Sequence, residues 1–252
     1  MTGFADYPSL RGRSVLITGG ASGIGASMVA AFAAQGARVG FIDIDDGAAE
    51  TVQQAAKGSR PAYRRADVTD IPALKEAIAE LAAEIGAIDI LINNAADDSS
   101  QATPSVTPDD WNARLAVNLN HHFFAAQAIS PGMKAAGGGV ILNVGSIIWR
   151  IGQAGRPAYA TAKAAIVGLT RSLARELGGD NIRVNCLMPG AVLTEKQKAM
   201  WMTPEYEATV LGAQCLKRHI MPDEVARLAL FLASDDSAGI TSQNFIIDGG
   251  WV

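Results

Sequence analysis

The sequence predicts an α/β protein with a doubly wound fold, in which a seven-stranded parallel sheet is flanked by helices on both faces. Short apolar runs alternate with longer amphipathic segments along the chain. The runs are apolar almost throughout, as expected of strands that are buried on both faces. A glycine-rich turn over residues 19–25 joins the first run to the first amphipathic segment. Strands and helices that alternate in this way imply right-handed crossovers and a parallel sheet.

The expected elements can be placed in chain order. Strands are expected at 14–18, 39–43, 63–65, 89–93, 140–144, 182–187 and 244–247, and helices at 24–35, 46–57, 71–86, 108–130, 157–178 and 222–234. The Rossmann topology then predicts the strand order 3-2-1-4-5-6-7, with a site at the carboxyl ends of the strands. Residues 193–212 break the pattern, because Met200, Trp201 and Met202 lie among polar residues. This composition suits a flap over a pocket, and it also suits an ordinary pair of surface helices.

Length and composition indicate one domain over residues 1–252. Hydrophobic residues make up 49% of the chain, which at this length is enough for a full core. The net charge of −4 gives no reason to expect nucleic acid or an anionic membrane as a partner. The first residues lack the pattern of a signal peptide, and no apolar run approaches the roughly 18 residues of a membrane span. A cytoplasmic protein is therefore expected.

The cysteines and histidines offer no metal site or disulfide framework. Cys186 and Cys215 are the two cysteines, and they do not form a CxxC pair. This favours a reducing compartment. His121 and His122 are adjacent, and adjacent side chains on a helix are expected to diverge. No metal is expected.

The glycine-rich turn has the spacing G-x-x-x-G-x-G between a strand and a helix. Glycines at this position let the backbone approach a pyrophosphate, and the helix N-terminus supplies free N–H groups. The turn is expected to bind a dinucleotide through Gly19, Ser22, Gly23, Ile24 and Gly25.

Asp43 ends the second strand, where an acidic side chain would hydrogen-bond an adenosine ribose. The alternative is a solvated strand end or a helix cap. A carboxylate here would repel the 2′-phosphate of NADP, and no Arg or Lys lies in the glycine turn or directly after Asp43. NAD is therefore the expected cofactor.

Tyr159 and Lys163 are four residues apart on a predicted helix, so their side chains share a face. Oxidation of an alcohol needs a base for the hydroxyl proton while a nicotinamide takes the hydride. An unperturbed tyrosine has a pKa near 10, and it would need a shift of roughly 2–3 units to serve near neutrality. The ammonium of Lys163 and the pyridinium of NAD are the expected sources of that shift.

The ordered set Thr18–Gly25, Asn93–Ala95, Asn118, Ser146, Tyr159-x-x-x-Lys163 and Pro189-Gly190 resembles the short-chain dehydrogenase/reductase family over essentially the whole chain. The resemblance implies that Asn118, Ser146, Tyr159 and Lys163 are catalytic, with Asn118 holding a water that relays the proton. The alternative for Asn118 is a local helix kink without chemistry, and both can hold together. It implies adenine contacts from Asp67 and Val68, and nicotinamide-side contacts from Asn94, Tyr159, Lys163, Pro189, Gly190 and Thr194. Ala96 departs from the glycine that is usual in the family. The resemblance also implies a homotetramer that packs through alanine-rich faces of the helices at 108–130 and 157–178. Their alanines are Ala113, Ala116, Ala125, Ala126, Ala160 and Ala164.

The candidate substrate residues border the predicted cleft. An aldose would be recognised by hydrogen bonds and aromatic stacking. The candidates are Trp149, Arg150, Gln153, His122, Gln197 and Trp201, with Asp97 and Asp98 as further hydrogen-bonding groups or loop caps. Core or interface positions remain open for His122, a buried aromatic position for Trp149, and a solvent-facing position for Arg150.

Three functions are left open. The stretches YPSL, GSIIW, WMTPE and DGGW resemble bacterial NAD-dependent xylose, arabinose and galactose dehydrogenases, which implies oxidation of an aldose at C1 to its lactone. The second candidate is an NAD-dependent dehydrogenase of a 2-keto-3-deoxy sugar acid, whose carboxylate Arg150 or Arg156 would bind. The third is a redox-inert NAD-binding regulatory module.

Overall fold

The structure is a computed structural model that describes residues 4–200 and 202–252. In this part of the chain, seven parallel strands form one sheet in the order β3-β2-β1-β4-β5-β6-β7, which confirms the predicted fold class and strand order. The strands are β1 (Ser14–Thr18), β2 (Arg38–Asp43), β3 (Ala62–Arg65), β4 (Ile90–Asn93), β5 (Gly139–Val144), β6 (Ile182–Pro189) and β7 (Asn244–Ile247). Every residue of β1, β4 and β5 is buried, as their apolar sequences predict.

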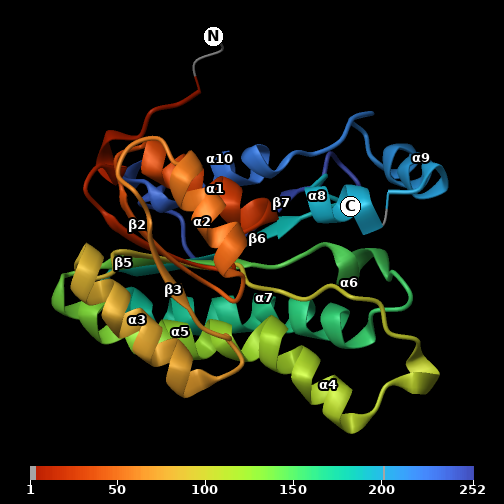
Figure 1. Cartoon of the computed structure of the whole chain (residues 1–252), viewed down its shortest axis with the longest axis horizontal. Helices are drawn as coiled ribbons and strands as arrows, with labels where there is room; N and C mark the ends of the chain where they lie inside the picture. The colour runs from red at the N-terminus through yellow and green to blue at the C-terminus, as the bar shows by residue number, and fades with distance from the viewer. Residues whose placement is uncertain (1–3, 201) are drawn as a thin grey trace.

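Helices cover both faces of the sheet (Figure 1). On one face lie α1 (Gly23–Ala34), α2 (Asp46–Ala55) and α10 (Pro222–Ala233). On the other face lie α3 (Ile71–Ile85), α4 (Pro108–Leu115), α5 (His121–Ala135) and α7 (Pro157–Leu177). The short helices α6 (Ile148–Ile151), α8 (Glu195–Met200) and α9 (Pro204–Ala213) follow β5 and β6. Among the described residues, no helix combines the length and the apolar character needed to cross a membrane.

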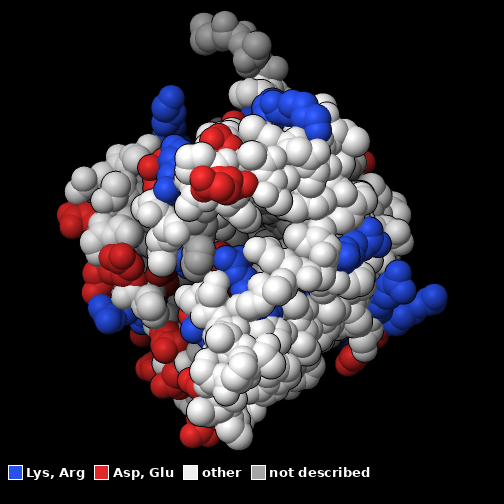
Figure 2. Space-filling view, turned by 90° about the vertical axis from the view of Figure 1, so that its right-hand side faces the viewer, with Lys and Arg blue, Asp and Glu red and all other residues white. Residues whose placement is uncertain are grey.

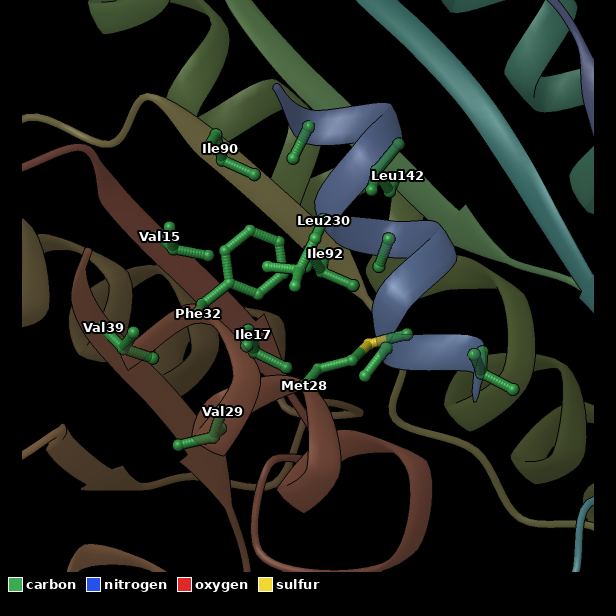
Figure 3. Packing of buried hydrophobic residues seen from close by; sticks show 14 of the residues in the cluster. Val15, Ile17, Met28, Val29, Phe32, Val39, Ile90, Ile92, Leu142 and Leu230 are labelled. Carbon is green, nitrogen blue, oxygen red and sulfur yellow. The ribbon is translucent and has the colours of Figure 1, made fainter. Parts of the chain in front are cut away.

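The core under α1 and α10 shows why the apolar runs form a sheet. Phe32 and Met28 of α1 pack beside Leu230 of α10 and over Ile17 of β1 and Ile92 of β4 (Figure 3). Phe32, Met28, Ile17 and Ile92 are inaccessible to solvent. Burial of each such side chain contributes about 1.5–3 kcal/mol to the free energy of unfolding. The packing holds the first strand and its following helix rigidly together.

The observed helical segment differs in two ways from the helix predicted at 108–130. A π-helical turn, Ala116–Asn120, divides it into α4 and α5. The helix α5 also continues past Pro131 to Ala135, although proline removes a backbone donor. The hydroxyl of Ser130 donates to the carbonyl of Gln127, the group that residue 131 would otherwise bond. This contact explains how the helix tolerates the proline.

The segment 193–212 contains two short helices, α8 and α9. Two such helices fit both a flap over a pocket and an ordinary pair of surface helices. It is anchored at its start by a bridge between Val192 and Ile220. At its far end, His219 Nε2 lies 2.6 Å from Glu207 Oε1 of α9.

Candidate active site

A cavity of about 620 Å³, here called the long cavity, opens beyond the carboxyl ends of the central strands. Figure 2 views the molecule from the side on which these strands end, and it shows a hollow bordered by Lys or Arg and Asp or Glu atoms. The structure brings every expected cofactor residue to its lining: Gly19, Ser22, Gly23, Ile24, Gly25, Asp43, Asp67, Val68, Asn94, Tyr159, Lys163, Pro189, Gly190 and Thr194. These residues come from all parts of the chain, and only the parallel sheet makes them neighbours.

The glycine turn leaves its backbone open toward this cavity. Gly19 has φ of +67°, a conformation that favours glycine. A Cβ atom on Gly25 would lie 1.9 Å from the carbonyl oxygen of Gly19, so no other residue fits at this position. Ser22 begins α1, and its side chain makes no capping hydrogen bond. The free N–H groups of this helix N-terminus and the open turn fit the pyrophosphate of a dinucleotide.

Thr18 and Asn94 hold the turn in place. The hydroxyl of Thr18 accepts hydrogen bonds from the backbone N–H groups of Asn94 and Ala95, at 3.0 and 3.1 Å. The Asn94 amide donates to the carbonyl oxygens of Thr18 and Gly19, at 3.1 and 2.9 Å. Asn94 therefore positions the glycine turn as well as lining the cavity. The positioning role of Thr18 was missed from sequence, because it depends on the pairing of β1 with β4.

Asp43 lines the cavity beside the glycine turn. Its Oδ2 accepts a hydrogen bond from the N–H of Ala21 at 2.9 Å, and its Oδ1 accepts one from Ile44 at 2.7 Å. Both contacts come from backbone, so the carboxylate is fixed in orientation while it lines the cavity. This arrangement fits a ribose whose hydroxyls donate to a carboxylate.

Tyr159 and Lys163 lie one turn apart on α7, and both line the cavity. Lys163 Nζ lies 5.5 Å from the centre of the Tyr159 ring, and it donates to the carbonyl of Val144 at 2.8 Å. Ser146 follows β5 and is hydrogen-bonded to Tyr159, and its Oγ accepts from the N–H of Ile148 at 3.1 Å. A phenol, a hydroxyl and an ammonium are thus gathered within one site.

Burial dominates the electrostatics of this group. It raises the pKa of Tyr159 well above its ordinary value, with a further increase from the charge of Asp98 and a decrease from the hydrogen bond with Ser146. It lowers the pKa of Lys163 to about 8. The expected lowering of the Tyr159 pKa is therefore not found in the protein without a cofactor. The positive charge of the NAD pyridinium is the other source expected to lower it.

Asn118 lies in the π-helical turn and is buried, and it does not line the cavity. Its Nδ2 donates to the carbonyl oxygens of Asp97 and Arg114, both at 3.0 Å, and its Oδ1 accepts from the N–H of Asp97 at 3.0 Å. Both amide protons are engaged by backbone. The side chain thus ties the segment after β4 to the helix, and its contact with a relay water stays a prediction.

A smaller cavity of about 70 Å³ adjoins Ser146 and Tyr159. Of the candidate substrate residues, Gln153 and Gln197 line it, and so does Asp98. Arg156, Tyr206 and Trp251 complete its polar and aromatic lining. Tyr206 and Trp251 were not singled out from sequence, since nothing in the local pattern shows that α9 and the chain end return to this point.

Three candidate substrate residues lie outside both cavities. Trp149 and Arg150 belong to α6, which directs them outward, and the Arg150 guanidinium lies 5.4 Å from the centre of the Trp149 ring. His122 is buried in the core, where its Nδ1 lies 3.3 Å from Asn143 Oδ1. These positions agree with the alternatives left open for His122 and Arg150, a core position and a solvent-facing one, because side-chain direction depends on helix phase. Trp201 lies outside the described residues.

The adjacent histidines do not diverge as expected, because their ring centres are 4.3 Å apart next to the π-helical turn. Burial lowers the pKa of both rings, that of His121 to about 3. Asp97 pairs with Arg114 and caps its own loop through Ser99. No group of three His, Cys, Asp or Glu side chains suited to a metal occurs among residues 4–200 and 202–252.

The chain is similar to known proteins over most of its length. A family model described as enoyl-(acyl carrier protein) reductase matches residues 19–252. The structure of a doubly mutated short-chain dehydrogenase/reductase of Serratia marcescens is 33% identical with a TM-score of 0.89, covering 96% of this chain and 99% of that one. The chain belongs to the short-chain dehydrogenase/reductase family. As a member of that family it is an oxidoreductase acting on CH–OH groups with a nicotinamide cofactor.

Individual members of the family are similar over nearly the full chain. D-xylose 1-dehydrogenase of Caulobacter vibrioides is 49% identical over 249 residues, which are 98% of each chain. A protein of Rhizobium meliloti named probable galactose dehydrogenase is 48% identical, covering 98% of this chain and 97% of that one. The structure of a 7α-hydroxysteroid dehydrogenase with NADH and 7-oxo glycochenodeoxycholic acid has a TM-score of 0.93 and 32% identity, covering 99% of this chain and 98% of that one.

Proposed function

We propose that this short-chain dehydrogenase oxidises an aldose at C1 to its lactone with NAD. The observation that carries the proposal is the position of Ser146 and Tyr159, which line both the long cavity and the small polar one. A dinucleotide in the first and a sugar in the second would meet at these side chains. The names of the relatives from Caulobacter vibrioides and Rhizobium meliloti support an aldose as the substrate class.

Each catalytic residue has a separate part in this reaction. When bound, an oxidised nicotinamide supplies the hydride acceptor. Ser146 donates a hydrogen bond to the C1 oxygen and so holds it beside Tyr159. Tyr159 takes the hydroxyl proton, and the Lys163 ammonium below it stabilises the phenolate. Asn118 positions the loop carrying Asp97 and Asp98, next to the small cavity.

NAD is preferred to NADP in this proposal because of Asp43. The carboxylate is held by the N–H groups of Ala21 and Ile44 and lines the cavity. A 2′-phosphate placed against it would meet a like charge, which costs several kcal/mol when both groups lose water.

The assembly and location form part of the same proposal. One oxidoreductase domain spans residues 1–252, with residues 193–212 as its substrate flap, and the chain acts in the cytoplasm as a homotetramer. Free Cys186 and Cys215 agree with a reducing compartment. Ala125 and Ala126 are buried against the sheet and cannot serve the interface, whereas Phe123 of α5 is 39% exposed and can.

The test is oxidation of a panel of aldoses by the purified protein, measured by the absorbance of NADH. D-xylose, L-arabinose and D-galactose are expected to include the preferred substrate. The same panel is measured with NADP in place of NAD. Failure of every aldose would overturn the aldose assignment, and a redox-inert NAD-binding module would show no turnover with any alcohol.

A further inference from the structure

We infer that Asp98 and Arg156 form a charge-balanced subsite that makes the enzyme select neutral sugars and reject sugar acids. The inference rests on the proposed function, and it concerns how the small cavity distinguishes its substrates. Arg156 is the cation of this cavity's lining and could by itself attract a carboxylate. Asp98 lies beside it in the same lining.

The geometry places the two charges close together at the site of reaction. Arg156 Nη1 lies 4.0 Å from Asp98 Oδ2, and the side chains are 9% and 21% exposed. Arg156 precedes α7, three residues before Tyr159. Partly buried opposite charges at this distance offset each other strongly, because little water screens them. A substrate therefore meets a polar pair with no net charge.

The hydrogen-bonding atoms of the subsite also suit hydroxyl groups. Gln197 Nε2 lies 3.5 Å from Asp98 Oδ2, while Gln197 Oε1 is inaccessible to solvent and has no hydrogen-bond partner among the described residues. Asp98 thus contributes acceptor oxygens to a lining that also contains Arg156, and a small rotation of the Gln197 amide would add its unpaired oxygen. A sugar hydroxyl can both donate and accept, whereas an ionised carboxylate can only accept. Burial of unpaired acceptors against a carboxylate would be costly.

Lys196 is the second cation near Asp98, and it has a different position. Its Nζ lies 2.7 Å from Asp98 Oδ1, but its side chain belongs to α8 and is 50% exposed. Lys196 lines the long cavity and not the small one. The two cations share Asp98, but the half-exposed charge of Lys196 is screened by water more than that of Arg156, and Asp98 is the carboxylate beside Arg156 in the small cavity.

The experiment compares D-galactose with D-galacturonate, which share the reacting C1 and differ in a carboxylate at C6. The ratio of kcat/KM for the two sugars is measured with NAD in wild type, D98N and D98E. Wild type should favour D-galactose by at least about a hundredfold, and D98N should narrow the ratio by at least about tenfold, because the carboxylate beside Arg156 is neutralised. D98E keeps the charge and should keep the wild-type ratio within about threefold.

Two further variants separate charge from flap contact. K196M removes the flap ion pair of Asp98 and should not improve D-galacturonate. R156Q should lower kcat/KM for D-galacturonate below the wild-type value, because the cation is absent. This variant replaces D98N as the test if D98N does not fold. Wild-type preference for D-galacturonate, or an unchanged ratio in a folded D98N, would overturn the inference while the dehydrogenase remains active on aldoses. A wild type that oxidises no aldose would instead overturn the proposed function, and the inference with it.

Discussion

Lys163 donates from Nζ to the carbonyl of Val144 at 2.8 Å, which fixes a buried ammonium at the carboxyl end of β5. The same ammonium lies 5.5 Å from the centre of the Tyr159 ring. The backbone of the sheet thus sets the position of the charge beneath the proposed base. Because the pKa of Lys163 is lowered to about 8, the group is charged at neutral pH and loses its charge in mildly alkaline solution.

Replacement of Tyr159 by Phe should lower kcat by at least about 10³, because the proton acceptor is lost. NAD affinity, measured by fluorescence titration, should stay within a few-fold. Tyr7→Phe, at the far N-terminal segment, is the matched control and should retain wild-type kcat. A Tyr159→Phe variant with a tenth of wild-type activity would exclude Tyr159 as the base.

Replacement of Lys163 by Met should change how stability depends on pH. Between pH 8 and 10.5 the unfolded lysine binds a proton that the folded one has lost, so wild-type stability rises over this range relative to the variant. The full change corresponds to about 3 kcal/mol. Denaturant unfolding at a series of pH values measures the difference in the free energy of unfolding. A difference that is constant from pH 7 to 10.5 would contradict the lowered pKa.

Asp43→Ala should weaken the binding of NAD. It should also lower the ratio of kcat/KM for NAD to that for NADP by one to two orders of magnitude, about 1.4–2.8 kcal/mol. The reason is loss of both the ribose contact and the repulsion of a 2′-phosphate. Asp45→Ala is the control, since Asp45 caps α2 and does not line the cavity. The ratio of kcat/KM for the two cofactors is the measurement. Wild-type preference for NADP would show that the role assigned to Asp43 is wrong.

His121 should make the protein sensitive to acid. Its pKa is lowered from 6.5 to about 3 by burial and by the charge of Lys163. Below pH 6.5 the unfolded state binds a proton that the folded state does not, so stability falls as pH falls, by up to about 1.4 kcal/mol per pH unit. The free energy of unfolding, measured with denaturant, should fall less steeply in His121→Asn than in wild type between pH 6 and 4. Between pH 7 and 8 the difference between the two proteins should stay constant. Equal slopes in the acid range would refute the assignment.

Light scattering should give a mass about four times the 26.2 kDa of one chain. Phe123→Glu, at a half-exposed position on α5, should reduce this mass because a charge would be buried in the interface. Arg150→Glu is the control, since it also places a carboxylate on the surface, here by reversing a charge, but lies on α6. A wild-type mass near 26 kDa at working concentration would rule out the tetramer.

The sequence predicted which residues would reach the cavity where their positions follow from one local element. The glycine turn, Asp43 at the end of β2, and the four-residue spacing of Tyr159 and Lys163 each follow from one element, and all face the cavity. The apolar runs likewise predict the strands, because burial on both faces leaves no room for polar residues. These features do not depend on the phase of a distant helix.

The sequence left positions open where orientation depends on tertiary contacts. Trp149 and Arg150 follow Ser146 closely, yet neither lines the small cavity. The π-helical turn lies beside His122 and contains Asn118, whose amide is held by the backbone of Asp97. A helix kink at Asn118 was one interpretation of the sequence, but its π-helical form depends on packing against the rest of the fold. Trp251 reaches the small cavity only because β7 pairs with β6 at the edge of the sheet.

The crowding at Gly25 limits how this chain can change by mutation. A single methyl group there would meet the carbonyl oxygen of Gly19, and Gly19 itself holds a backbone conformation that other residues resist. Replacing either glycine alone would therefore disturb the turn, so the two positions are constrained together. Ser22 lies between them with an unconstrained side chain. Variation in the cofactor loop is thus confined to the residues between its fixed glycines, and new cofactor preferences must arise there or at the end of β2.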